Sequence, residues 1–205
     1  MLLEIKYGKR FEFRTIKTTL ARMGWYNKMG YKPILPKNID KTSSEKEIKE
    51  QIAKKFDEDK FKTIAQNMNR KFSKISAKLS ETLNLYFKNV PKLIKVYLTN
   101  YGMGGSYDTP NKIIINVKHS PSIKVIYHEM MHLCIDDDIE KYKIEQWEKE
   151  KIVDLILNSK EFGFLKYNIW QPDYQGVEKY VDPLFYKYFF KDQNKFYSEI
   201  KKARS

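Results

Sequence analysis

Two of the three histidines in this chain stand four residues apart, in the pentapeptide His128-Glu129-Met130-Met131-His132. Residues four apart lie on one face of a helix, so both imidazoles can reach one zinc ion. The glutamate between them holds the position of a general base, which takes a proton from a zinc-activated water. The spacing therefore predicts a hydrolytic zinc site, with His128 and His132 as metal ligands and Glu129 as the catalytic base.

A catalytic zinc ion normally takes a third ligand from the protein and leaves its fourth position to water. Glu150 follows 18 residues after His132, and Asp154 follows one helical turn later, so both carboxylates share one helix face. We expect Glu150 to bind the metal and Asp154 to accept the N–H of a ligating imidazole, which fixes the tautomer of that histidine. Glu145 and Glu148 are neighbouring alternatives to Glu150.

Asp136 is a rival third ligand, because His128, His132 and Asp136 share a helix face. At a rise of about 1.5 Å per residue, however, His128 and Asp136 would lie about 12 Å apart along one continuous helix. That separation is too large for zinc bonds of about 2 Å. An ion held between two helices is the better prediction.

The elements that must position these residues can be read from the surrounding pattern. Ser120 resembles an N-cap and Pro121 a first helical residue, so we expect a helix to about Cys134, ended by the acidic run 136–138. Its residues other than the motif are nearly all apolar, which is typical of a buried helix. A second helix is expected over about 144–159. Strands are expected at 93–98 and 112–117, with the glycine-rich segment 101–107 as the turn between them.

The flanking regions give weaker signals. Residues 1–43 lack a clear pattern and are expected to be irregular, whereas Ser44 and Glu47 form a capping box that starts a helix. An apolar stripe predicts a single long helix over about 59–86. We therefore expect an α+β fold, mostly helical with a small twisted sheet. It would be one compact domain of residues 1–205, with an N-terminal region (1–90), a catalytic core (91–160) and a helical C-terminal region (161–205).

The motif His-Glu-x-x-His followed by Glu-x-x-x-Asp resembles the gluzincin clan of zinc metallopeptidases, which includes thermolysin-like enzymes and very small relatives. The resemblance covers residues 112–158 and implies a zincin-like core with an active-site helix and a glutamate helix. It implies His128, His132 and Glu150 as ligands of one zinc ion, Glu129 as the base and Asp154 as the outer partner. It also likens the strand Ile113–Val117 to the edge strand that pairs with extended substrate.

Related enzymes commonly add a downstream His or Tyr that stabilises the oxyanion. No histidine follows His132, and Tyr174, Tyr180, Tyr186 and Tyr188 are equivalent candidates among 15 tyrosines. His119, which precedes the active-site helix, is interpreted as a turn or surface residue. A flanking segment that lies across the site and inhibits it is a further hypothesis.

Composition bounds the partners. The chain carries a net charge of +13, which attracts phosphate backbones, but lysines alternate with acids and no nucleic-acid motif accompanies them. Nucleic acid is therefore the less favoured partner, and a peptide or protein substrate the favoured one. The single cysteine, Cys134, and the absence of a signal-like or membrane-spanning apolar run favour a cytoplasmic protein.

The sequence thus predicts a zinc-dependent peptidase. A non-catalytic or auto-inhibited zinc protein, with a regulatory or nucleic-acid-binding role, is the alternative. A purely structural zinc site would instead have four protein ligands. The substrate, the cleavage preference, endopeptidase or exopeptidase action and the oligomeric state are not encoded in any pattern that we can interpret.

Overall fold

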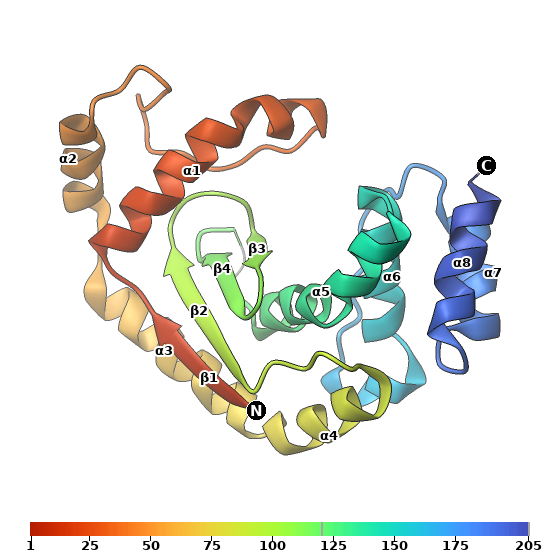
Figure 1. Cartoon of the computed structure of the whole chain (residues 1–205). Coiled ribbons are helices and arrows are strands. Elements are labelled where there is room, and N and C mark those ends of the chain that lie inside the picture. The colour runs from red at the N-terminus through yellow and green to blue at the C-terminus, as the bar shows by residue number, and fades with distance from the viewer. Residues whose placement is uncertain (120, 205) are drawn as a thin grey trace. The chain divides into compact units, whose positions relative to one another are not determined.

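The computed structural model describes residues 1–119 and 121–204. It confirms the expected α+β class, because eight α-helices and a 3₁₀ helix accompany one four-stranded mixed sheet in the described ranges (Figure 1). No helix in those ranges is both long and apolar enough to cross a lipid bilayer. The elements follow in the order β1 (Leu2–Lys6), α1 (Lys9–Lys28), α2 (Glu45–Lys55), α3 (Glu58–Ser73), α4 (Ser76–Tyr86), β2 (Leu93–Thr99), β3 (Gly105–Asp108), β4 (Lys112–Asn116), α5 (Ile123–Tyr142), α6 (Gln146–Leu157), η1 (Lys160–Leu165), α7 (Glu178–Tyr188) and α8 (Gln193–Ala203).

The chain forms two compact units. Unit 1 comprises Met1–Ser76 and Lys92–Glu129, and unit 2 comprises Ala77–Pro91 and Met130–Ser205. Helix α5 belongs to both, since it begins in unit 1 and continues into unit 2. The expectation of one compact domain stays a prediction.

The sheet of unit 1 has the strand order β1-β2-β4-β3. Strands β1, β2 and β4 are parallel, and β3 runs antiparallel to β4 with Gly105 opposite Ile115. The comparison of Ile113–Val117 with an edge strand was therefore wrong, because β4 lies between β2 and β3. The edge is β3, in the glycine-rich segment that the sequence suggested was only a turn.

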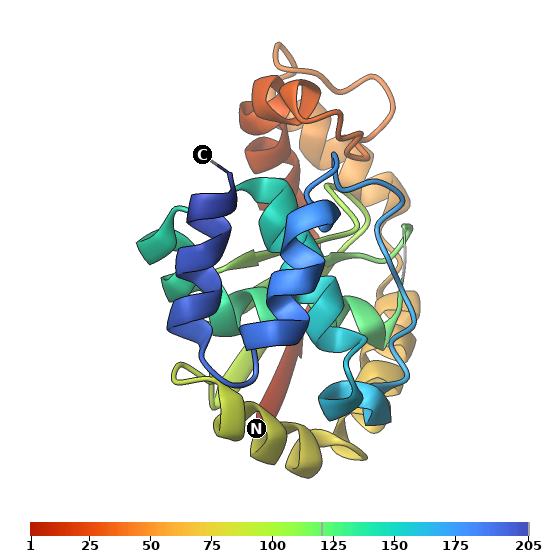
Figure 2. The ribbon, with the colours of Figure 1, turned by 90° about the vertical axis from the view of Figure 1, so that its right-hand side faces the viewer.

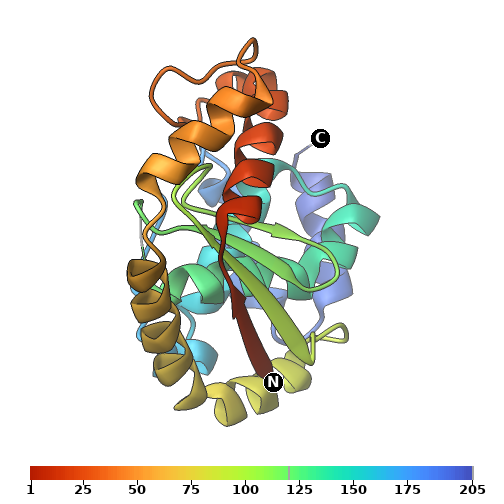
Figure 3. The ribbon, with the colours of Figure 1, turned by 90° about the vertical axis from the view of Figure 1, so that its left-hand side faces the viewer.

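The two faces of the sheet differ in polarity because side chains alternate along each strand. One face carries fully buried aliphatic side chains, including Val96, Leu98, Ile113 and Ile115, and the register places Gly105 on this face. The opposite face carries half-buried residues such as Tyr97 and Ile114. Helix α1 lies along this second face (Figure 3). There the ring of Phe11 packs on that of Tyr97, with 4.7 Å between centroids.

The N-terminal region departs from the expectation of irregular structure, since it forms β1 and the 20-residue helix α1. Helix α1 begins after Gly8, which has no side chain to cap the helix, so the usual side-chain start signal is missing. Its buried positions also include Glu12 and Thr19, which weakens the apolar stripe that predicts a helix.

The long helix expected over 59–86 is two helices. Helix α3 ends at Ser73 and α4 begins at Ser76. The hydroxyl of Ser73 donates to the carbonyl of Arg70, and that of Ser76 donates to the carbonyl of Ser73. These local bonds compete with the helical ladder, which accounts for the break.

Helix α5 does not end at the acidic run, contrary to expectation. It continues through Asp136, Asp137 and Asp138 to Tyr142, because Ile135 and Ile139 keep its apolar face buried while Asp137 is exposed. The proposed N-cap, Ser120, lies outside the described residues. Helix α6 matches the helix expected over 144–159 to within two residues at each end.

In unit 2, helices α7 and α8 lie side by side after α6 and η1 (Figure 2). An aromatic cluster joins α7 to α8, in which Phe189 contacts Phe185, Phe196 and Tyr197 with ring centroids 4.7, 5.1 and 6.3 Å apart. All four rings are buried. The C-terminal region is thus helical, and its buried rings form a hydrophobic cluster within unit 2.

Candidate metal centre

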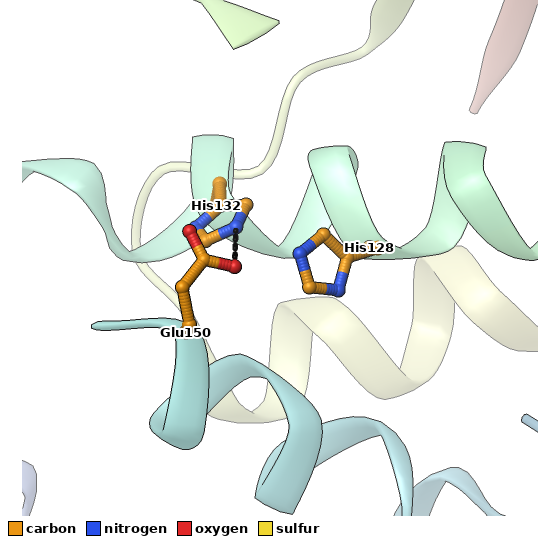
Figure 4. Close-up of side chains that lie close together, drawn as sticks. All are labelled: His128, His132 and Glu150. Atoms are coloured by element: carbon orange, nitrogen blue, oxygen red, sulfur yellow. Dashed lines mark ion pairs between the residues drawn. The ribbon is translucent and has the colours of Figure 1, made fainter. Parts of the chain in front are cut away.

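Helices α5 and α6 bring together the three residues expected to bind a metal. His128, His132 and Glu150 each offer one ligand atom, and these atoms all lie within 4.8 Å of one another. The two histidines lie one turn apart on α5, and Glu150 points toward them from α6 (Figure 4). The arrangement thus matches the combination of an i,i+4 histidine pair with an acid from a separate helix.

The spacing of the ligand atoms suits a zinc ion. Ligands bound at about 2.0–2.2 Å with tetrahedral angles are separated by about 3.4 Å. The Nε2 atom of His132 lies 3.4 Å from Oε2 of Glu150 (dashed in Figure 4). The distance between these two atoms is therefore compatible with a shared tetrahedral ion.

Burial supports the same interpretation. His132 is 2% exposed and Glu150 is 9% exposed, while His128 is half-buried. Charged and polar groups removed from water require compensation by hydrogen bonds, partners or a metal ion. The other carboxylate oxygen of Glu150, Oε1, accepts a hydrogen bond of 2.7 Å from the Gln146 side chain. Gln146 thereby orients Glu150 with Oε2 toward His132.

Glu129 lies against the edge strand of unit 1. A β-carbon added to Gly105 would lie 2.3 Å from Oε1 of Glu129 and 2.7 Å from Cγ1 of Val125. Only a residue without a side chain therefore permits β3 to approach the first turns of α5 this closely. Glu129 itself is 7% exposed. The structure thus places the expected base directly beside the backbone of an edge strand.

Asp154 is buried in a set of hydrogen bonds from the segment after η1. Its Oδ2 atom accepts from the hydroxyl of Tyr174 at 2.6 Å and from the backbone N–H of Gln171 at 3.0 Å, and Oδ1 accepts from Tyr167 at 3.4 Å. Burial and the bond to Asp154 raise the pKa of Tyr174 well above its ordinary value. Asp154 is thus a fixed acceptor one turn after Glu150, and its role toward an imidazole stays a prediction.

The alternative ligands either pair with other residues or lie too far from the histidines. Glu148 is fully buried, accepts a hydrogen bond of 2.7 Å from the hydroxyl of Tyr180, and forms an ion pair with Arg204, whose Nε lies 3.2 Å from the carboxylate. Glu145 pairs with Arg204 at 3.0 Å. Asp136 lies two turns beyond His128 on the same unbroken helix, which keeps the two residues about 12 Å apart along its axis. Within the described ranges, the cluster that could hold a metal ion therefore contains Glu150 rather than these acids.

The remaining candidates fall into different environments. Tyr174 bonds to Asp154, Tyr180 bonds to Glu148, and Tyr186 is 72% exposed. His119 is exposed, but its ring packs at the start of β3, where a β-carbon on Gly104 would lie 3.0 Å from Nδ1. The sequence offered no basis for choosing among the tyrosines.

Two residues of the site were missed at the sequence level. Gln146 lies four residues before Glu150, so helical spacing alone could have paired them. Gly105 stood in a segment whose clustered glycines were assigned to a turn. A glycine inside a strand can also mark a place where another segment packs closely against the strand. No protein-family model, curated protein or solved structure matches this chain.

Proposed function

We propose that this chain is a zinc-dependent peptidase with a gluzincin-like centre. The observation that carries the proposal is the convergence of His128, His132 and Glu150, with Glu129 between the histidines in sequence and beside an edge strand in space. Three protein ligands leave a position for water, which is the pattern of a catalytic zinc site.

The chain's own residues supply the remaining functions. A zinc ion, when bound, would lower the pKa of a water ligand to about 7 and polarise the substrate carbonyl. Glu129 takes the proton of the attacking water on its carboxylate and passes it to the departing amine nitrogen. The buried position of Glu129 limits competition from bulk water for that carboxylate.

Substrate would bind as an added strand. As the edge strand, β3 offers backbone N–H and C=O groups on the side away from β4. An extended peptide can pair with those groups, which aligns its backbone independently of its sequence. Because Glu129 lies against Gly105, pairing along β3 would bring a peptide bond close to the base.

A peptide-library assay tests the proposal. The wild-type protein should cleave, and Glu129→Gln should lose about 10²–10⁴-fold in kcat/KM, the usual contribution of a positioned general base. The variant should retain zinc, since Glu129 is not among the three ligands. Undiminished cleavage by Glu129→Gln would refute the assignment of the base.

A second candidate is a non-catalytic or auto-inhibited zinc protein that binds nucleic acid. The distribution of charge favours it, because unit 1 holds 24 basic and 11 acidic residues whereas unit 2 holds 15 of each, so the whole net charge of +13 falls in unit 1. This candidate predicts no cleavage by wild type and a DNA or RNA affinity that falls steeply with salt.

A further inference from the structure

A pocket opens on the face of the sheet that is turned away from Glu129. It has a volume of about 360 Å³ and lies within unit 1, between α1 and the strands β2, β3 and β4. That volume is within the range of roughly 300–1,000 Å³ typical of ligand-binding pockets. The pocket is therefore large enough to hold a side chain with its neighbouring backbone.

The pocket is lined mainly by cations and hydroxyl groups. Arg14, Thr18 and Arg22 line it from α1, where their spacing of four residues places them on one helix face. Lys112 and Ser106 line it from β4 and β3. Its one acid in the described residues is Asp108, which pairs with Lys112 at 3.3 Å. Both arginines thus remain in excess of the acidic charge.

The charge of the surrounding unit reinforces this local excess. Unit 1 carries the whole net charge of the chain, and a net positive charge favours the approach of acidic ligands. A guanidinium group also binds a carboxylate through two parallel hydrogen bonds, which gives arginine particular strength toward acidic side chains. Acidic groups are therefore the complementary ligands.

Strand β3 connects this pocket to the proposed catalytic centre. Gly105 faces Glu129, and alternation along the strand turns Ser106 and Asp108 toward the opposite face and the pocket. The pocket is lined by three consecutive residues, Ser106–Asp108, so it reaches the strand's backbone as well as its side chains. A peptide paired with β3 would alternate in the same way, with every second side chain directed to the pocket face.

We propose that this pocket is a specificity subsite that selects an acidic side chain in the substrate, with Arg14 and Arg22 as its binding residues. The inference rests on the proposed peptidase function and names the substrate class. The substrates would be peptides with Asp or Glu at the alternate positions whose side chains point to the pocket face, which we call the positions of one parity relative to the cleaved bond. Positions of the other parity face α5 and gain nothing from these arginines.

Two measurements test the subsite. The first is cleavage of a peptide library in which each position carries Glu, Gln or Lys in turn. We expect kcat/KM to favour Glu over Gln by about tenfold at alternate positions, because two charge pairs at a solvent-exposed site each add a small attraction. In the double variant Arg14→Gln, Arg22→Gln this ratio should fall to about one. The matched control is Lys17→Gln, Lys28→Gln, which removes the same charge from α1 outside the pocket lining and should keep the wild-type ratio.

The second measurement separates the subsite from the catalytic proposal. Fluorescein-labelled peptides that contain Glu or Gln at the selected parity are titrated onto Glu129→Gln protein, whose slow cleavage leaves the peptides intact during the titration. Tighter binding of the Glu peptide that depends on Arg14 and Arg22 would support the subsite even if no peptide is cleaved. Cleavage without any alternate acidic preference would overturn the subsite and leave the peptidase standing. An equal loss of the Glu preference in the lysine control would also overturn the subsite, since the preference would then reflect overall charge. Preferential binding of a DNA oligonucleotide over both peptides would overturn it as well.

Discussion

Replacement of Gly105 by alanine is the sharpest perturbation of the proposed centre that leaves every ligand intact. The added β-carbon would lie 2.3 Å from Oε1 of Glu129, whereas ordinary van der Waals contact begins near 3.4 Å. It would also lie 2.7 Å from Cγ1 of Val125. The carboxylate of Glu129 must therefore move by about 1 Å, or β3 must move away from α5 by a similar distance.

The two contacts have separable consequences. The Glu129 carboxylate is the end of a flexible side chain, so its displacement costs little stability but misplaces the base, and a misplacement of about 1 Å can cost about 10²-fold in rate. The Val125 contact is with a short branched side chain, and such overpacking destabilises by about 1–3 kcal/mol. Gly105→Ala should therefore lose about 10²-fold in kcat/KM and lower the melting temperature, while its zinc content stays at the wild-type level.

The assay measures kcat/KM, bound zinc and melting temperature on the same preparation. Gly24→Ala is the matched control, because no atom lies within 4 Å of the position that its new β-carbon would take. It should keep the wild-type kcat/KM and zinc content, and its melting temperature should stay the same or rise, because alanine is favoured over glycine inside a helix such as α1. Adding Val125→Ala to Gly105→Ala removes the second contact only, so stability should recover while activity stays low. Wild-type kcat/KM in Gly105→Ala would refute the placement of the base, as would a loss of activity that merely follows a loss of zinc.

Four further predictions concern the ligands and the buried acids. Glu150→Ala should weaken zinc binding by more than the roughly 10–100-fold expected for an outer partner. The control Glu140→Ala, which removes an exposed acid from α5, should leave the zinc affinity unchanged. Competition with a chromophoric chelator measures both affinities, and equal zinc affinities for the two variants would remove Glu150 from the site. Asp154→Asn should weaken zinc binding by roughly 10–100-fold if Asp154 orients an imidazole, and unchanged affinity with a lowered melting temperature would limit it to holding Tyr174 and Gln171. Glu12→Ala should destabilise unit 1 by about 2–4 kcal/mol in urea unfolding, because the N–H groups of Asn100 and the hydroxyl of Thr99 lose a buried acceptor. Burial raises the pKa of Glu12 above its ordinary 4.5. The stability gained from its protonation is therefore present below pH 4.5 and lost as the pH rises through the folded-state pKa. Glu12→Gln should flatten this part of the stability profile, and an unchanged profile would contradict the raised pKa of Glu12.

The predictable parts of the fold were those with local signals. The capping box at Ser44 is present, with the backbone N–H of Ser44 donating to Glu47 at 2.7 Å. The helix that carries Glu150 was also predictable, because its apolar residues recur at helical spacing and are buried. The spacing of His128 and His132, together with that of Glu150 and Asp154, predicted which side chains would lie close, because helical periodicity depends only on local geometry.

The unpredicted parts depend on contacts between distant segments. Helix α1 is fixed by the buried carboxylate of Glu12, which bonds to Thr99 and Asn100 some 87 residues later, and no local pattern reports such a bond. The assignment of β3 as the edge strand likewise depends on β1 pairing with β2, on the far side of the sheet. Gly105 could be interpreted only after its neighbour on α5 was known.

Zinc titration with a simultaneous cleavage assay tests the central claim most directly. Metal-stripped protein is titrated with zinc while hydrolysis of a cleavable peptide is followed. The account predicts a rate that rises linearly and saturates at about one zinc per chain, since His128, His132 and Glu150 form one three-ligand site with an open position. It also predicts that Glu129→Gln takes up the same zinc while its rate stays about 10²–10⁴-fold below that of the wild type. Peptide hydrolysis that is independent of zinc, or saturating zinc that yields no hydrolysis of any peptide in the library, would contradict it.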